Sequence, residues 1–273
     1  TSKEIEGIGI AMMLANTYHL YLRPGIPVIE EIGGLHEFMA WDGAILTDSG
    51  GYQVFSLAPL RRVSDEGVIF RSHIDGSEHL ITPELAIQYQ ESLGADIIMV
   101  LDECLSSGES WANVQRAVDR THQWAERCQK AQRRSDQALY AIVQGGVFPE
   151  LRQRSVEYLT ALDFPGYAIG GLSLGEPKRV TMSIIEETAV LLPESKPRYL
   201  MGMGSPEDIV EGVASGIDIL DSALPTRVAR NGALFTRRGR LNIENAAYRQ
   251  KEQPVDPDCA CYPCRTFSAA YLH

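Results

Sequence analysis

The sequence predicts an α/β fold, a single (β/α)8 or TIM barrel that spans residues 1–273. Seven short apolar runs recur along the chain, and each ends in Gly, Asp, Asn or Gln. Continuous apolar runs of this length are typical of strands that are buried on both faces, as in parallel sheets. Stretches with helical periodicity lie between them, so strand and helix alternate. An open doubly wound sheet is the structural alternative.

The predicted strands follow in order along the chain, and their sequences are MMLANTYHL, AILTDSGG, DIIMVLDE, ALYAIVQGG, YAIGGLSLG, RYLMGMG and IDILDSALP. Since a barrel of this kind has eight strands, we expect one further strand before Thr1. Three helices carry clear signals. Residues 82–94 begin with a Thr cap followed by Pro, residues 111–128 repeat apolar positions at helical spacing, and residues 205–216 have a Ser cap and a terminal Gly.

Two segments interrupt this alternation. Residues 58–82 predict a β-hairpin excursion with its turn at Asp75-Gly76. Residues 227–273 predict a basic, irregular and cysteine-bearing subdomain within the barrel domain.

Composition restricts the compartment and the partners. The net charge of −11 means that a nucleic acid would need a local basic patch. Five cysteines, three of them crowded, argue against a disulfide framework and for a reducing compartment. We see neither a signal peptide nor an apolar run long enough for a bilayer, and we therefore expect a cytoplasmic protein without a membrane partner.

Polar residues follow the predicted strands, where a barrel carries its active site. They are Asn16, Asp48, Asp102, Gln144, Gly170-Gly171 and Asp221. Carboxylates that converge at one mouth suit chemistry at a glycosidic carbon, with one attacking or stabilising an oxocarbenium-like centre and another moving a proton. Any single Asp could instead cap the following helix. A glycoside hydrolase that uses Asp48 and Asp221 is the alternative enzyme.

A nucleobase pocket is a second expectation. Gln144 offers an amide for a purine edge, Gly171 and Leu172 offer free backbone groups, and Tyr52 offers a face for stacking. The alternatives are a tight βα turn at TDSGG and a core aromatic at Tyr52.

The C-terminal part combines a metal signal with a charge signal. Cys259, Cys261 and Cys264 have a spacing that can wrap one tetrahedral zinc ion. The tract from Arg227 to Lys251 holds seven Lys or Arg and one acid, which leaves −17 on the rest of the chain. Such segregation favours a polyanion partner, whose phosphates would be contacted by the tract.

These residues lie in longer motifs, among them LANTYHLYLRPG, AWDGAILTDSGGYQVFSL, FRSHIDGS, IVQGGV, GYAIGGLSLGEP, the run from Arg198 to Thr236, and CACYPC. Over nearly its whole length the chain resembles the tRNA-guanine transglycosylases. The resemblance implies an eight-stranded barrel with a zinc-bearing insertion near the C-terminus. It also implies an exchange of the wobble guanine of GUN-anticodon tRNAs for a 7-deazaguanine, through a covalent enzyme–RNA intermediate, in queuosine biosynthesis.

The resemblance also implies roles. Asp221 would be the nucleophile on the anomeric carbon and Asp48 the general base. The base edge would be held by Asp102, Gln144, Gly171 and Leu172, and its faces by Tyr52 and Met201. Arg227 and Arg230 would read neighbouring anticodon bases, with Arg237, Arg238 and Arg240 as further RNA contacts. Asn16, Cys104 and Glu176 complete the expected substrate site, Glu176 as an offset for an aminomethyl cation.

Finer expectations follow from particular positions. Relatives that take queuine have Gly where this chain has Leu174 and an aliphatic residue where it has Cys104, so 7-aminomethyl-7-deazaguanine (preQ1) is the expected base. The family's first strand lies before Thr1 and its zinc-binding His lies beyond His273, so the chain is expected to be truncated at both ends. The family is usually dimeric, which implies a homodimer. A non-catalytic tRNA-binding partner subunit is the remaining alternative, but such a subunit should lack the two acids.

Overall fold

The fold is that of a computed structural model, which describes residues 1–57 and 61–273. The chain forms two compact units. Unit 1 consists of residues Thr1–Met203 and Glu207–Asp221, and unit 2 consists of Gly204–Pro206 and Ser222–His273. Each unit has its own cluster of buried apolar side chains.

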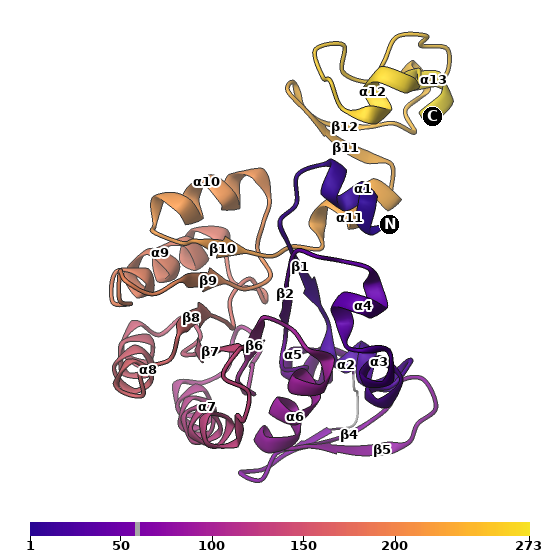
Figure 1. Ribbon diagram of the computed structural model, residues 1–273. Helices are drawn as coiled ribbons and strands as arrows, with labels where there is room; N and C mark the ends of the chain where they lie inside the picture. Colours follow the sequence, from indigo (N-terminus) through magenta and orange to yellow (C-terminus); the bar gives the residue numbers. More distant parts are fainter. Residues whose placement is uncertain (58–60) are drawn as a thin grey trace. The chain divides into compact units, whose positions relative to one another are not determined.

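Unit 1 is built on a curved sheet of seven parallel strands (Figure 1). All seven predicted strands are confirmed. They pair in the order of the chain, which is the order of a barrel, whereas a doubly wound sheet reverses its order at a switch point. The described sheet is therefore a half-barrel of TIM type. Its strands are β1 (Met12–Ala15), β2 (Ala44–Thr47), β6 (Ile97–Met99), β7 (Ala138–Val143), β8 (Gly166–Ile169), β9 (Arg198–Leu200) and β10 (Ile219–Leu220).

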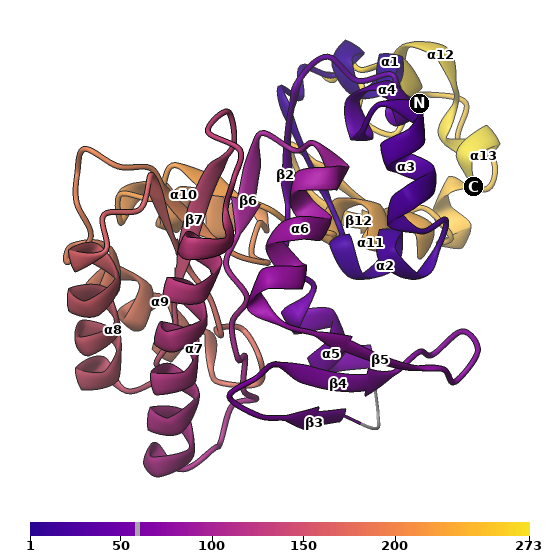
Figure 2. The same cartoon turned by 60° about the horizontal axis from the view of Figure 1, so that its bottom comes forward.

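Helices follow the strands and cover the outside of the sheet, as Figure 2 shows for α6 to α9. Helix α1 (Ser2–Gly7) precedes β1. Three short helices follow β1, namely α2 (Thr17–Leu22), α3 (Ile26–Ile32) and α4 (Leu35–Met39), and α5 (Gly51–Leu57) follows β2. The longer helices are α6 (Pro83–Leu93), α7 (Trp111–Ala131), α8 (Pro149–Ala161), α9 (Lys178–Ala189) and α10 (Pro206–Ala214).

The Thr cap predicted for residues 82–94 is present, and a further cap begins α7. The Thr82 hydroxyl accepts a hydrogen bond from the backbone N–H of Leu85 and starts α6, which ends at Gly94 in the left-handed conformation. Ser110 caps α7 in the same way. Helix α7 then turns a continuous buried face toward the sheet, including Val118, Ala125 and Cys128. Local capping and apolar spacing therefore agree with the packing of these helices.

The excursion between α5 and α6 is a three-stranded antiparallel sheet of β3 (Arg61–Val63), β4 (Val68–Arg71) and β5 (Glu78–Ile81). The predicted hairpin is confirmed for β4 and β5. Their connection contains Asp75, which accepts from the Ser77 N–H, and Gly76 at a φ of 75°. The first predicted residues, 58–60, lie outside the described part.

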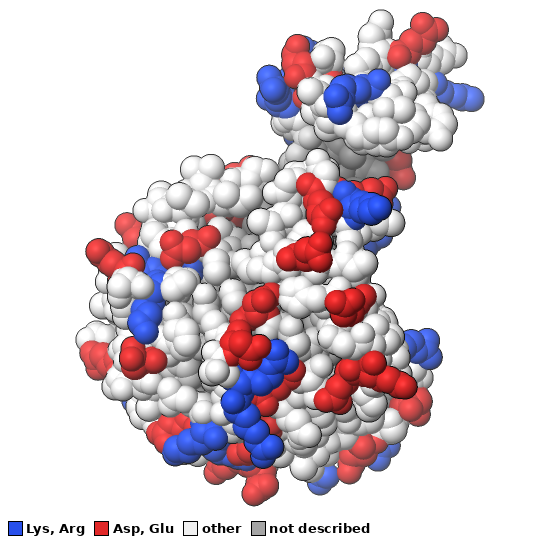
Figure 3. All heavy atoms as spheres, viewed as in Figure 1, with Lys and Arg blue, Asp and Glu red and all other residues white. Residues whose placement is uncertain are grey.

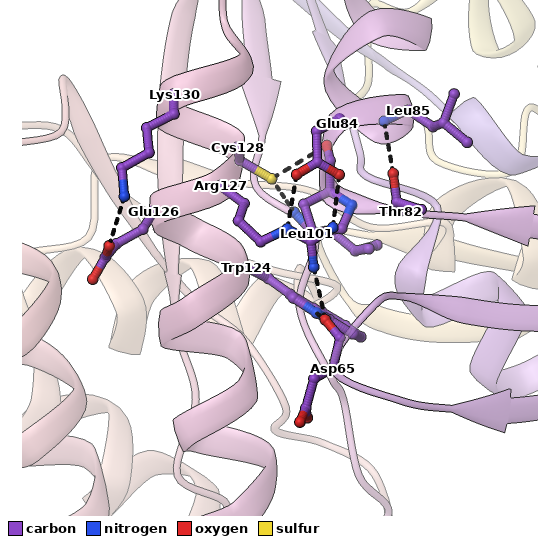
Figure 4. A network of polar contacts seen from close by, with 11 residues as sticks. Asp65, Thr82, Glu84, Leu85, Leu101, Trp124, Glu126, Arg127, Cys128 and Lys130 are labelled. Carbon is purple, nitrogen blue, oxygen red and sulfur yellow. Dashed lines mark hydrogen bonds and ion pairs between the residues drawn. The ribbon is translucent and has the colours of Figure 1, made fainter.

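Helix α7 anchors this excursion and α6 (Figure 4). The Arg127 guanidinium donates two hydrogen bonds of 2.7 Å to the Glu84 carboxylate and a third to the Asp65 carbonyl oxygen, which also accepts from the Trp124 indole. This bidentate pair holds the pKa of Glu84 down to about 2. One helical turn after Trp124, the Cys128 sulfur accepts a hydrogen bond from the Leu101 N–H, so α7 also fixes the segment that follows β6.

Unit 2 contains α11 (Leu224–Arg230), the antiparallel hairpin β11 (Ala233–Thr236) and β12 (Gly239–Asn242), a 3-10 turn at Ala246–Tyr248, α12 (Tyr262–Thr266) and α13 (Ala269–Leu272). Ile243, Val255 and Ala269 form its small core. The segment predicted to be irregular thus contains a regular hairpin. Its assignment as a zinc-binding part of one barrel domain stays a prediction.

Two features of the structure concern possible partners: the distribution of charge on the surface, and the length and apolar character of the helices. On the face that Figure 3 shows, acidic and basic side chains are interspersed over unit 1. In the described part of the chain, no helix combines the length and the apolar character that crossing a bilayer requires.

Candidate active site

The carboxyl ends of the unit 1 strands collect the polar residues that the sequence singled out. Asp48 follows β2, Asp102 follows β6, Gln144 follows β7, and Asp221 follows β10. Because these strands are parallel and adjacent in chain order, their ends open at one edge of the sheet. The fold therefore brings Asp48, Asp102 and Asp221 to the same edge of the sheet, as expected.

Asp48 is a buried carboxyl, 7% exposed, that several donors hold in place. The backbone N–H groups of Thr17 and Gly50 donate to Oδ1 at 2.9 and 3.2 Å, and the Asn16 amide donates to Oδ2 at 2.6 Å. Burial nonetheless raises the pKa of Asp48 to about 7, against these donors and with a further contribution from the charge of Asp221. Asp48 is therefore poised to exchange a proton near neutral pH.

Asn16 is oriented from the other side. Its Oδ1 accepts from the backbone N–H of His19, as the cap of α2, and lies 2.6 Å from the His19 Nδ1. With Oδ1 so engaged, the amide N–H faces Asp48. The expected site residue Asn16 thus positions the carboxyl of Asp48.

Asp221 is half-buried at the end of β10. Its Oδ1 accepts from the Tyr199 hydroxyl at 2.6 Å and from the backbone N–H of Gly202 at 2.7 Å. Burial and the charges of Asp221 and Asp48 raise the pKa of Tyr199 well above its ordinary value, so the phenol stays a donor. Two donors on one oxygen fix the carboxylate and leave Oδ2 for chemistry. Tyr199 was not predicted from the sequence, where it is one aromatic in an apolar strand.

Asp102, Gln144 and Gly171 form a second group. The Gln144 amide donates to Asp102 Oδ2 at 2.6 Å, and burial raises the pKa of Asp102 to about 6. Gly171 has a φ of 67°, and a Cβ there would lie 2.1 Å from Gln144 Oε1. Only glycine therefore fits beside the amide. A carboxylate, an amide and exposed backbone groups can together read the edge of a guanine-like base.

The buried Arg152 on α8 supports this group and was missed by the sequence analysis. Its guanidinium donates to the carbonyl oxygens of Val143 at 2.8 Å and Gly146 at 2.9 Å, and reaches that of Gly171 at 3.5 Å. It thus ties the end of β7 to the two loops that carry Gln144 and Gly171. Nothing in PELRQR distinguishes Arg152 from its exposed neighbour Arg154, because α8 is only weakly amphipathic.

We expect Arg152→Met to weaken base binding selectively. Methionine keeps the apolar stem but leaves buried carbonyls without donors, so the loops around Gln144 relax. The KM for the base should rise about tenfold or more, with little change in the KM for the polynucleotide, and Arg152→Lys should recover part of the loss. Arg154→Met, which removes only a surface pair with Asp119, is the matched control. Equal effects of both Met variants on the KM for the base would contradict this role.

The remaining expected substrate residues differ in exposure. Tyr52 is 44% exposed at the start of α5, and Met201 is half-buried directly after β9. Leu172 and Cys104 are buried, and burial raises the pKa of the Cys104 thiol. That Tyr52 and Met201 hold the two faces of one base stays a prediction.

Glu176 is engaged within its own loop. Its carboxylate accepts from the backbone N–H groups of Ser173 and Leu174 and from the Thr181 hydroxyl. Burial acts to raise its pKa, but these donors together hold the pKa below its ordinary value. Glu176 is therefore an anion that orders the loop after β8, and it lines a pocket together with Gln144 and Gly171.

The expected RNA and metal residues lie in unit 2. Arg227 and Arg230 are exposed and three residues apart on α11, so they share one helix face. Arg237 and Arg238 form the turn between β11 and β12, and Arg240 lies on β12. The sulfurs of the three cysteines Cys259, Cys261 and Cys264 all lie within 4.8 Å of one another. His273 instead places Nδ1 2.8 Å from the Ile243 carbonyl oxygen.

Comparison with known proteins gives one consistent result. A family model described as queuine tRNA-ribosyltransferase matches residues 1–273. The chain is 63% identical over 273 residues to the queuine tRNA-ribosyltransferase of Dehalococcoides mccartyi, covering 100% of this chain and 70% of that protein. Those of Moorella thermoacetica and Halothermothrix orenii are 57% and 56% identical over 272 residues, which is 100% of this chain and 73% of each relative.

Proposed function

Because the chain belongs to the queuine tRNA-ribosyltransferase family, we propose that it is a pentosyltransferase that exchanges the wobble guanine of GUN-anticodon tRNAs for preQ1. One observation carries the mechanism. Two carboxyls at the carboxyl ends of β2 and β10, Asp48 and Asp221, interact electrostatically but have different surroundings. Asp48 has a pKa raised to about 7, while Asp221 is fixed by two donors. This division suits one proton carrier and one nucleophile.

In the proposed reaction, Asp221 Oδ2 attacks the anomeric carbon of the ribose. The glycosidic bond to guanine breaks, its electrons stay with the base, and the protonated Asp48 carboxyl donates its proton to the released nitrogen. A covalent enzyme–RNA ester results, and the phosphodiester chain stays intact. The Asp48 carboxylate then accepts the proton of the incoming base at its ring nitrogen, and that nitrogen displaces Asp221. Each half-reaction is the reverse of the other in its bond changes.

Base selection is proposed to rest on the second polar group. Asp102 would accept N–H donors of the base, and Gln144 and the backbone beside Gly171 would contact its carbonyl edge. Leu174 would fill the space that the ring of queuine needs, which favours preQ1. Glu176 stays an anion in this pocket and would offset the aminomethyl cation, in addition to ordering its loop.

The alternative readings fit less well. A glycoside hydrolase could use Asp48 and Asp221, but it needs neither an arginine tract nor a zinc site. A non-catalytic partner subunit should lack the two acids, and both are present with supporting donors. We further propose that the protein acts in the cytoplasm, as a homodimer, on the anticodon loop.

Zn²⁺ is the proposed metal of unit 2. Zn–S bonds of about 2.3 Å place tetrahedral sulfurs about 3.8 Å apart, which the cluster of Cys259, Cys261 and Cys264 can satisfy with small adjustments. Cys264 also packs against the small core around Ile243 and Val255. Zinc would therefore hold the segment from Cys259 to Cys264 together and stabilise a core that is small by itself.

We expect Cys261→Ser to release the zinc. A serine hydroxyl is a poor zinc ligand, so bound metal should fall from about one per chain to near zero, and unit 2 should lose protection against proteolysis. Cys128→Ser, which changes a buried thiol of unit 1, is the matched control and should retain the metal. Metal analysis of purified protein checks both. Full zinc occupancy in Cys261→Ser would contradict the assignment.

The proposed activity is tested by incorporation of labelled guanine into a tRNA with a GUN anticodon, followed by chase with unlabelled preQ1. Incorporation that the chase reverses is the expected result. A tRNA with a different first anticodon base is the control substrate and should stay unlabelled. Absence of incorporation while the tRNA is bound would favour the non-catalytic partner subunit.

A further inference from the structure

Unit 2 contains a pocket that the proposed reaction does not use. Its volume is about 340 Å³, which lies within the range of small-ligand sites. The pocket lies between the β11–β12 hairpin and the segment 248–257. Its lining is Thr236, Arg238, Gly239, Arg240, Leu241, Tyr248, Lys251, Gln253, Pro254, Val255, Asp256 and Pro257.

The charged groups of this pocket are three cations and one acid. Arg238 and Arg240 come from the hairpin, and Lys251 comes from the opposite side. The acid, Asp256, is already engaged, because its two oxygens accept from the backbone N–H groups of Asp258 and Arg237 at 3.1 and 3.2 Å. Arg238 additionally faces Asp258 at 3.7 Å, which leaves Arg240 and Lys251 as the cations without a carboxylate within 4 Å in the described part of the chain.

The lower part of the pocket is apolar and aromatic. Leu241, Tyr248 and Val255 line it, and all three belong to the small core of unit 2. The Lys251 ammonium lies over the face of the Tyr248 ring, 5.4 Å from its centre. An aromatic surface with cations beside it is the arrangement that holds a nucleotide, the base or ribose on the ring and the phosphate on the cations.

We propose that this pocket takes one nucleotide of the tRNA substrate, with its phosphodiester on Arg240 and Lys251 and its base or sugar against Tyr248. The proposal rests on the proposed function, since it supplies a second contact for the same polynucleotide. It differs from a diffuse basic surface, because Arg240 and Lys251 line one pocket together with Leu241, Tyr248 and Val255.

The test compares tRNA binding by Arg240→Gln, Lys251→Gln and Arg249→Gln at several salt concentrations. Arg249 belongs to the same basic tract and loses the same charge, but it does not line the pocket. We expect each pocket variant to weaken binding about five- to tenfold and to reduce the slope of log K against log salt by about 0.7. Arg249→Gln should change affinity less than twofold. Equal losses in all three variants would overturn the pocket in favour of general charge.

The aromatic floor is tested separately. Tyr248→Phe should bind tRNA as the unchanged protein does, whereas Tyr248→Leu keeps apolar volume without a ring face and should weaken binding about tenfold. Circular dichroism establishes whether each variant is folded. If Tyr248→Leu unfolds, Arg240→Gln and Lys251→Gln, at exposed or half-buried positions, decide whether the pocket binds a nucleotide. Binding by Tyr248→Leu equal to that of Tyr248→Phe would remove stacking from the proposal.

Guanine exchange separates this proposal from the function on which it rests. With an active unchanged protein, the pocket variants should raise the KM for tRNA and leave the KM for the base as it was. If the unchanged protein is active but the pocket variants keep its KM for tRNA, the pocket proposal is overturned and the proposed function is not. An inactive protein overturns the proposed function, and the binding comparison still decides whether the pocket takes a nucleotide.

Discussion

Replacement of Asp221 by Asn is expected to lower guanine exchange by at least about 10³-fold and to abolish the covalent enzyme–RNA intermediate. The amide keeps the shape of the side chain but is not nucleophilic, so the first bond to the ribose cannot form. Tyr199 and Gly202 can still donate to the Asn oxygen, so the strand end should keep its structure. Exchange of labelled guanine under single-turnover conditions measures the loss.

Tyr199→Phe is the matched variant for this prediction. It removes only the hydroxyl that donates to Asp221 and should lower the exchange rate about ten- to hundredfold, since hydrogen bonds to charged groups contribute about 1.5–3 kcal/mol. The covalent intermediate should still form, more slowly. An Asp221→Asn protein as active as Tyr199→Phe would contradict the nucleophilic role.

The second large effect concerns pH. Because burial raises the pKa of Asp48 to about 7, the carboxyl is protonated below that pH and becomes a base only above it. The rate at which saturating base displaces Asp221 from the preformed covalent intermediate should therefore fall about tenfold for each pH unit below 7 and level off above it. Asp48→Asn should lower the rate about 10²- to 10⁴-fold and remove this dependence. Rate profiles between pH 5 and 9 test both expectations.

Asp102 provides the control for that profile. Its pKa is also raised, to about 6, so it too titrates near the lower part of the range. Since Asp102 is proposed to bind the base, Asp102→Asn should change the KM for the base and keep the dependence near pH 7 in the rate at saturation. If Asp102→Asn removed that dependence, the general base would have to be reassigned.

The seven strands were predictable because burial on both faces leaves continuous apolar runs, as in AILT before Asp48 and ALYAIV before Gln144. Their ends then placed the polar residues at one edge, since parallel strands share a direction. The same apolar runs also located the strands in their order along the chain. What needed the structure was the pairing pattern that excludes a doubly wound sheet.

The supporting residues could not be found in this way. Tyr199 lies inside an apolar strand, and only the neighbouring β10 brings Asp221 within 2.6 Å of its hydroxyl. Arg152 lies on a helix whose charged residues look alike in sequence, and its guanidinium is held by three carbonyl groups, at the end of β7 and on the loops after β7 and β8. Hydrogen bonds between distant segments leave no periodic signal, so site residues that act through others are the ones that sequence patterns miss.

The hairpin of unit 2 is a similar case. Arg237 and Arg238 read as the densest part of a basic tract, but the structure makes them a two-residue turn between paired strands, with Gly239 at a φ of 102°. Composition gives the charge of this segment, and pairing decides which cations face a common pocket.

Detection of the covalent intermediate is the sharpest test of nucleophilic attack by Asp221. The protein is incubated with a GUN-anticodon tRNA without added base, denatured, digested with nuclease and protease, and analysed by mass spectrometry. We expect a peptide that contains Asp221 and carries the mass of a nucleotide lacking its base, and we expect it to be absent in Asp221→Asn. A nucleotide on any other residue, or rapid guanine exchange without a detectable adduct, would contradict attack by Asp221.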